Sequence, residues 1–151
     1  MTMIVDTIDD LQPLVGKDLD PSPWVMIGQD RIDTFADATD DHQWIHTDPE
    51  RAKAGPFGTT IAHGYLTLSL LIPMWTEILD VRNVSAKVNY GLEKVRFPAP
   101  TPVGSRIRTV AQLTSVTDVA GGVQLTIAAT VEREGGDKPV CVASPVFRFY
   151  R

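Results

Sequence analysis

The segment IAHGYLTLSLLIPMWTEIL, residues 61–79, constrains the fold more than any other part of the chain. It is nearly long enough to span a bilayer, but it contains His63, Pro73 and Glu77 and has no basic flanks. We therefore expect a helix inside a globular fold, with a start that Thr59 or Thr60 can cap and a kink or change of register at Pro73. Because such a helix is apolar nearly all round, it needs protein on every side.

The residues before this helix predict a small number of local elements. Residues 22–28, SPWVMIG, favour a short strand. Residues 30–39, DRIDTFADAT, carry apolar side chains at helical spacing and predict an amphipathic helix. Residues 40–60 are rich in Asp, Pro and Gly, which predicts a loop with one short helix around 48–54.

The second half of the chain changes from a helical period to a period of two. Turn signals rich in Pro and Gly separate its apolar runs. Alternation is clearest in two runs, with apolar faces at Val84, Ala86, Val88 and Tyr90, and at Val123, Leu125, Ile127, Ala129 and Val131. The predicted strands are residues 84–90, 91–97 after a turn, 105–117, 122–134 and 139–150.

One long apolar helix followed by long strands predicts an α+β fold, in which a curved antiparallel sheet wraps around the helix. We expect a single domain over residues 1–151, with its core in about 20–150. Such a sheet leaves edge strands that must be covered or paired, so the chain should dimerise.

Charge and cysteine content exclude several classes of protein. The net charge is −5, which argues against nucleic-acid binding and against binding to anionic membranes. Cys141 is the one cysteine, so no internal disulfide forms, and a cytoplasmic setting is expected. Its apolar surroundings favour a buried structural thiol over a nucleophile. The first twelve residues lack the pattern of a secretory signal.

The stretch TDDHQWIH, residues 39–46, gathers groups that can transfer protons. On a regular helix Asp41 and His46 would point about 140° apart, but in a loop they can hold one water between carboxylate and imidazole. The alternative is that Asp40 and Asp41 end a helix and the histidines face water. His42 and His46 also have a spacing used by zinc ligands, but no further ligand lies nearby, so we expect no metal.

Gly64 stands where the apolar helix begins. Free N–H groups and the positive end of the helix dipole at such a position suit an oxyanion. A glycine there can equally allow close packing against a strand. The neighbouring His63 is interpreted as a packed, hydrogen-bonded histidine rather than as a catalyst.

Together these residues resemble the MaoC-like, (R)-specific enoyl-CoA hydratase family. The similarity covers about residues 20–150 and includes the His63–Gly64 pair and the run KVRFPAPTPVGSRI, residues 94–107. Residues that match the hydratase motif in type and spacing are Phe35, Thr39, Asp41, Ile45, His46 and Ala52.

This resemblance implies a dimeric hot-dog fold, in which a sheet wraps around a central helix. It also implies that Asp41 and His46 activate the water that adds to C3 of a trans-2-enoyl thioester. The N–H of Gly64 would bind the thioester oxygen. How Asp41 and His46 divide the proton stays open.

Three positions depart from the family pattern. Asp40 stands for Gly, Gln43 for Asn and Trp44 for Pro. Gln43 should still orient the site through hydrogen bonds. Asp40 could raise the pKa of Asp41 by like-charge repulsion.

The resemblance also places the two ends of the substrate. Ile72 and Trp75 fall where the family lines its acyl pocket, with plain core packing as the alternative. Candidate ligands for the phosphates of coenzyme A are Lys94, Arg96, Arg106 and Arg108.

The predicted activity is therefore hydro-lyase chemistry on an enoyl-CoA, without a metal or redox cofactor. Three alternatives stay open. They are a dehydratase acting on an acyl carrier protein, a hot-dog thioesterase, and a non-catalytic subunit that binds acyl thioesters. The Asp41–His46 spacing favours the hydratase.

Overall fold

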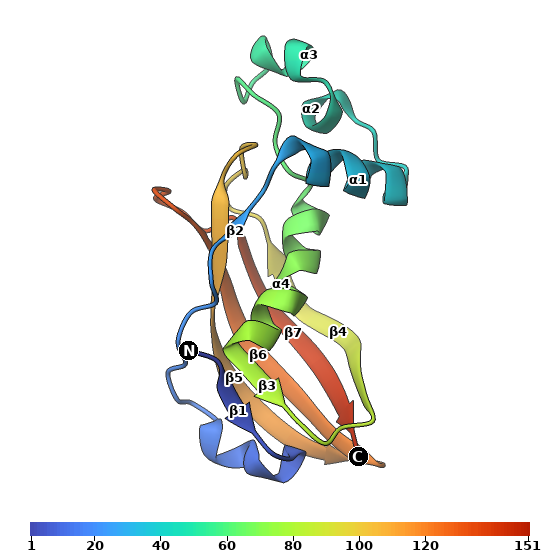
Figure 1. Ribbon diagram of the computed structural model, residues 1–151, viewed down its shortest axis with the longest axis vertical. Helices are drawn as coiled ribbons and strands as arrows, with labels where there is room; N and C mark the ends of the chain where they lie inside the picture. The colour runs from blue at the N-terminus through green and yellow to red at the C-terminus, as the bar shows by residue number, and fades with distance from the viewer.

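A five-stranded antiparallel sheet curves around one long helix, α4 (Gly64–Ile78), in the computed structural model, which describes residues 1–151 (Figure 1). The strand order is β2-β5-β6-β7-β4. The predicted α+β class and hot-dog arrangement are confirmed. The strands are β2 (Val25–Met26), β4 (Ala86–Arg96), β5 (Arg106–Val119), β6 (Gly122–Arg133) and β7 (Cys141–Tyr150).

The alternation in β6 produces a buried face, as predicted. Its inward residues lie in the same apolar cluster as Leu71, Met74 and Ile78 of α4. Burial of this face removes apolar surface from water and so stabilises the fold. The buried residues of β6 on this face are Val123, Leu125, Ile127, Ala129 and Val131.

The predicted start of α4 was wrong by three residues. The helix begins at Gly64 after the N-cap His63, and no side chain caps it. Ile61 and Ala62 are extended because their N–H groups donate to the carbonyls of Ile45 and Thr101. These contacts lie far apart in sequence, so local pattern could not reveal them. Pro73 lies inside the helix.

The N-terminal residues form elements that the sequence did not predict. β1 (Met3–Val5) pairs in parallel with β3 (Leu79–Val81), directly after α4. Two 3₁₀ helices follow β1, η1 (Ile8–Asp10) and η2 (Gln12–Leu14). Figure 1 shows these elements at the end of the molecule opposite α1. They close the core at the C-terminal end of α4.

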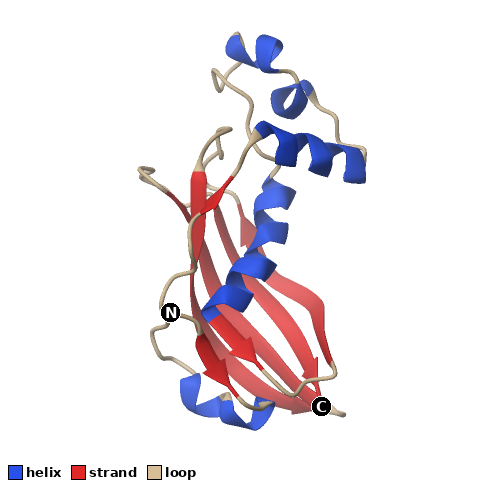
Figure 2. Ribbon diagram, viewed as in Figure 1, coloured by secondary structure: helices blue, strands red, loops and turns tan.

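Three short helices cover the N-terminal end of α4 (Figure 2). α1 (Gln29–Thr39) and α3 (Pro49–Lys53) confirm the predicted helices. α2 (Trp44–Thr47) lies in a segment that was predicted as loop. It is a single turn, too short to produce a periodic pattern.

β4 differs from its prediction in two ways. It is one continuous strand rather than two, because register shifts at Asn89/Gly91 and Leu92/Val95 let it bend without leaving its pairing with β7. Its side chains Val88, Tyr90 and Leu92 are exposed, with Tyr90 at 55%. The sequence predicted that one face of this strand is buried. In a single chain that prediction is wrong, because β4 is an edge strand.

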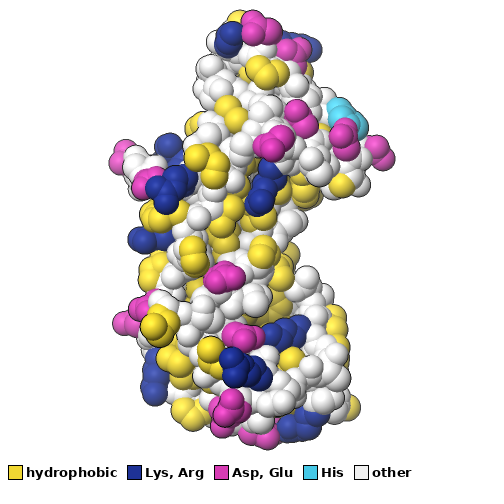
Figure 3. Space-filling view, viewed as in Figure 1, with side chains coloured by type: hydrophobic (Ala, Val, Ile, Leu, Met, Phe, Trp, Pro, Cys, Tyr) yellow, Lys and Arg dark blue, Asp and Glu magenta, His cyan; other side chains and the backbone are white.

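Coverage of α4 is also incomplete within one chain. Tyr65 is 71% exposed, and Leu68 and Ile72 are only partly buried. Figure 3 shows hydrophobic side chains gathered on the narrow middle of the molecule, below the three-helix end. The expectation of protein on every side of α4 is therefore not met by a single chain.

No helix in the structure is both long and apolar enough to cross a membrane. Cys141 is buried in the core, and burial raises the pKa of its thiol to about 11. The thiol is therefore protonated at neutral pH, which confirms the structural interpretation of this cysteine.

Candidate active site

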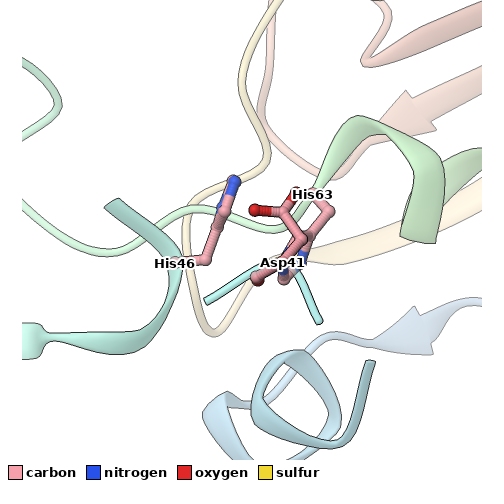
Figure 4. A group of neighbouring side chains, drawn as sticks. All are labelled: Asp41, His46 and His63. Carbon is pink, nitrogen blue, oxygen red and sulfur yellow. The ribbon is translucent and has the colours of Figure 1, made fainter. Parts of the chain in front are cut away.

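The structure brings Asp41 and His46 together, and it adds His63 to them (Figure 4). Asp40 ends α1 in the left-handed conformation, with φ of 59°, and the chain then turns back toward α4. Asp41 lies in the loop, His46 in α2, and His63 directly before α4. One carboxylate oxygen of Asp41 and one ring nitrogen of each histidine all lie within 4.8 Å of one another.

His46 is buried and has a defined orientation. Its Nδ1 lies 2.7 Å from the carbonyl oxygen of Ile61. Because a carbonyl can only accept, Nδ1 carries the proton and Nε2 keeps a free lone pair. Burial, reinforced by the nearby His63, lowers the pKa of His46 against the opposing effects of the Ile61 bond and Asp41. A neutral His46 can therefore accept a proton at Nε2.

Gln29 and Thr60 hold the backbone of His46 through a chain of hydrogen bonds. The Nε2 of Gln29 donates to the His46 carbonyl at 2.7 Å and to Asp33 at 2.9 Å. The Thr60 hydroxyl donates to Oε1 of Gln29 at 2.6 Å. The sequence did not predict this chain of hydrogen bonds, and Gln29 at the start of α1 carries no local pattern that would have shown it.

His63 is packed and hydrogen-bonded, as predicted. Its Nε2 lies 2.9 Å from the backbone oxygen of Asp41. Its ring stacks on His46, with centroids 3.8 Å apart and planes at 23°. Phe35, from α1, lies against the same ring at 4.9 Å between centroids.

Gly64 has both of the features expected for a glycine at this position, a free N–H and close packing. As the first residue of α4 it has an N–H without an acceptor in the chain. A Cβ on Gly64 would lie only 3.1 Å from the ring of Phe97, so the ring packs closely over it. A cavity of about 380 Å³ opens here, lined by Asp41, His46, His63, Gly64, Tyr65 and Phe97.

Gln43 and Trp44, which depart from the family motif, and the neighbouring His42 do not line this cavity. The Gln43 side chain is exposed and has no hydrogen-bond partner in the chain, so its orienting role stays a prediction; its carbonyl accepts from the N–H of His46 at 3.0 Å. Trp44 packs under the guanidinium of Arg51. His42 faces solvent and contacts Asp37 at 2.9 Å.

A metal could in principle use the same three side chains. Zinc requires nitrogen lone pairs that converge on one point at about 2.0–2.1 Å. In each of the two stacked rings, one nitrogen faces a backbone carbonyl, Nδ1 of His46 that of Ile61 and Nε2 of His63 that of Asp41. Each ring therefore has one nitrogen left for a ligand, and the expected absence of a metal stays a prediction.

Of the two predicted acyl-pocket residues, Ile72 lines a cavity and Trp75 does not. Ile72 borders a cavity of about 240 Å³ between α4, β4 and β7, with Leu68, Leu92 and Phe147. Trp75 is 3% exposed and stacks on Phe147, so it supports the wall from the core side. The acyl role of both stays a prediction.

The four basic candidates for the coenzyme phosphates divide into two pairs. Arg106 and Arg108 form ion pairs with Glu134 and Glu132, both at 3.0 Å. Lys94 and Arg96 lie on exposed β4 without an ion pair. The second pair precedes Phe97 closely in sequence, and neither member is neutralised by a carboxylate.

Comparison with known proteins places the chain in one family. Residues 10–135 match the MaoC like domain. The 3-hydroxyacyl-thioester dehydratase Z of Mycobacterium tuberculosis is 52% identical over 145 residues, which cover 95% of this chain and 96% of that protein. Nodulation protein N of Rhizobium leguminosarum is 43% identical, over 91% of this chain and 88% of that protein.

A solved structure agrees in fold. The R-hydratase PhaJ1 of Pseudomonas aeruginosa has a TM-score of 0.77 and 19% identity, over 96% of this chain and 86% of that one. The chain belongs to the MaoC-like domain family, as the motif resemblance indicated.

Proposed function

We propose that the protein is a hydro-lyase that reversibly converts trans-2-enoyl-CoA into (R)-3-hydroxyacyl-CoA in fatty-acid metabolism. One observation carries the proposal. The carboxylate of Asp41, the imidazole of His46 and the start of α4, where the Gly64 N–H is free, border one cavity. The dehydratase named among the relatives supports the same class of chemistry.

The chemistry follows from these three groups. Asp41 and His46 Nε2 hold a water, and its oxygen forms a bond to C3 of the enoyl thioester. The C2–C3 double bond opens toward the thioester, and the carbonyl oxygen gains enolate charge that the Gly64 N–H stabilises. The proton from the water passes through the Asp41–His46 pair to C2 on the same face. Dehydration is the reverse.

Binding of the substrate uses surfaces next to this site. The acyl chain enters the cavity that Ile72 borders, and Lys94 and Arg96 are the available cations for the coenzyme phosphates. No metal or redox group takes part in the proposed reaction. The single buried cysteine fits the cytoplasmic setting expected from the sequence.

We propose a second copy of the chain as the partner. β4 is an edge strand with exposed Val88, Tyr90 and Leu92, and α4 leaves Tyr65 uncovered beside it. Such an edge is normally paired or protected. Sedimentation velocity should give a dimer, and Tyr90→Lys should shift the distribution toward monomer; a monomeric wild type would contradict the proposal.

An assay with crotonyl-CoA and longer homologues separates the candidate activities. Loss of the conjugated enoyl absorbance without thiol release supports the hydratase. Thiol release would indicate a thioesterase. The same assay with acyl carrier protein thioesters identifies the carrier. No turnover at any chain length would instead support a non-catalytic, thioester-binding subunit.

A further inference from the structure

His63 is buried in a way that a plain core position does not require. It is 2% exposed, yet its Nδ1 has no hydrogen-bond partner. Its Nε2 faces a carbonyl oxygen and so carries the proton, which leaves a bare lone pair on Nδ1. Because a buried polar atom without a partner costs stability, an apolar ring would fill this position more favourably.

The one hydrogen bond that His63 makes falls on Asp41. It reaches the backbone oxygen of Asp41 at 2.9 Å, and no other hydrogen bond ties Asp41 to the chain. Asp41 itself is exposed, as are His42 and Gln43 after it. The position of the Asp41 backbone, from which the carboxylate projects, therefore depends on the contact with His63.

The ring of His63 also contacts the second catalytic candidate. It stacks on His46 at 3.8 Å, while His46 Nδ1 is held by Ile61 from another direction. His63 directly precedes Gly64, so it belongs to the same rigid helix start as the proposed oxyanion donor. His63 thus contacts two parts of the site through its side chain and is joined to the third through its backbone.

We propose that His63 is a positioning residue that sets the geometry between Asp41, His46 and the Gly64 N–H. It donates its Nε2–H to the Asp41 backbone and supports the His46 ring by stacking. The proposal deepens the hydratase function given above and rests on it. Misplacement of a reacting group by about 1 Å can cost roughly 100-fold in rate, which sets the size of the expected effect.

Two substitutions separate the hydrogen bond from the packing. His63→Phe keeps a stacking ring but loses the donor, and we expect kcat per folded protein to fall about 100-fold with KM changed by less than about threefold. His63→Gln can place an amide N–H near the position of Nε2, and it should retain kcat within about tenfold of the wild type. A His63→Phe variant as active as His63→Gln would overturn the proposal.

The pH dependence of kcat is a second measurement, and a residue that only stabilised the fold would not change it. Asp41 and His63 are the titratable groups that act on His46, and His63 lowers the pKa of His46. Both variants should therefore shift the acid limb of kcat to higher pH. His42→Phe, at an exposed histidine of the same segment, is the matched control and should leave kcat and its pH limb unchanged. An acid limb that stays in place in both His63 variants would overturn the proposal.

A measurement without turnover keeps the two proposals distinguishable. If the wild type hydrates no enoyl thioester, the proposed function fails on its own. Long-range ¹H–¹⁵N spectra of the wild type still report which nitrogen of His63 carries the proton. Protonation on Nε2 supports the contact with Asp41, and protonation on Nδ1 overturns it whatever the activity.

Discussion

The two ends of α4 have opposite surroundings. At the N-terminal end, the N–H of Gly64 is unpaired, and His46 and His63 are buried polar groups beside it. At the C-terminal end, Trp75 and Ile78 are no more than 3% exposed and lie in the apolar cluster that the N-terminal elements close. The first end retains free hydrogen-bonding groups, while the second removes apolar surface from water. Rate and stability should therefore respond to changes at different ends of one helix.

The largest expected effect is on rate, at the N-terminal end. Asp41→Asn and His46→Gln keep similar shapes but remove the carboxylate charge and the imidazole. Loss of general acid–base groups typically costs 10²–10⁴-fold, so we expect kcat to fall about 1000-fold in each. The melting temperature of Asp41→Asn should stay unchanged, because Asp41 is exposed. Wild-type hydration rates in both variants would contradict the site assignment.

A large effect on stability is expected at the other end. Ile78→Ala removes a side chain that is 1% exposed, and such changes cost about 2–5 kcal/mol. Urea unfolding should show this loss in the free energy of unfolding, while kcat per folded molecule stays near that of the wild type. Thr76→Ala, an exposed neighbour on the same helix, is the control and should change little. If kcat per folded molecule of Ile78→Ala fell as strongly as its stability, the two ends of α4 would not have separate effects on rate and stability.

The same contrast explains what the sequence could predict. Asp41, His46 and Gly64 lie in short motifs, so local spacing and family resemblance found them. The start of α4 and the Gln29–Thr60 support of His46 depend on contacts between residues 16 to 39 positions apart, such as Ala62 with Thr101, and no local pattern encodes these. Exposure of Tyr90 was missed because its alternation is the same whether an apolar face meets α4 or faces outward at a sheet edge.

A smaller effect tests the close packing at the helix start. Gly64→Ala keeps the N–H but places a Cβ about 3.1 Å from Phe97, so the ring must move by a few tenths of an ångström. We expect kcat/KM to fall about tenfold, since small displacements of an oxyanion donor weaken transition-state binding. Adding Phe97→Leu relieves the contact and should restore part of the loss. If Gly64→Ala alone has wild-type kcat/KM, close packing at this position does not control the site.

The smallest expected effect is a pH dependence, and it links stability and rate at His46. Burial lowers the pKa of His46 from its ordinary value of 6.5, so the unfolded chain binds this proton more readily than the folded one. Stability should therefore fall as pH drops from 6.5 through the folded pKa, and this contribution should be absent above 6.5. Hydration should lose rate around the folded pKa, at the lower end of this window, because protonated His46 has no lone pair at Nε2. Thermal unfolding and initial rates are measured between pH 5 and 8. The loss of rate should lie at the lower end of the pH range over which stability falls, and His46→Gln should abolish its part of the stability change. If the rate is lost above pH 6.5, where this group contributes nothing to the pH dependence of stability, the group that limits the rate is not the buried imidazole.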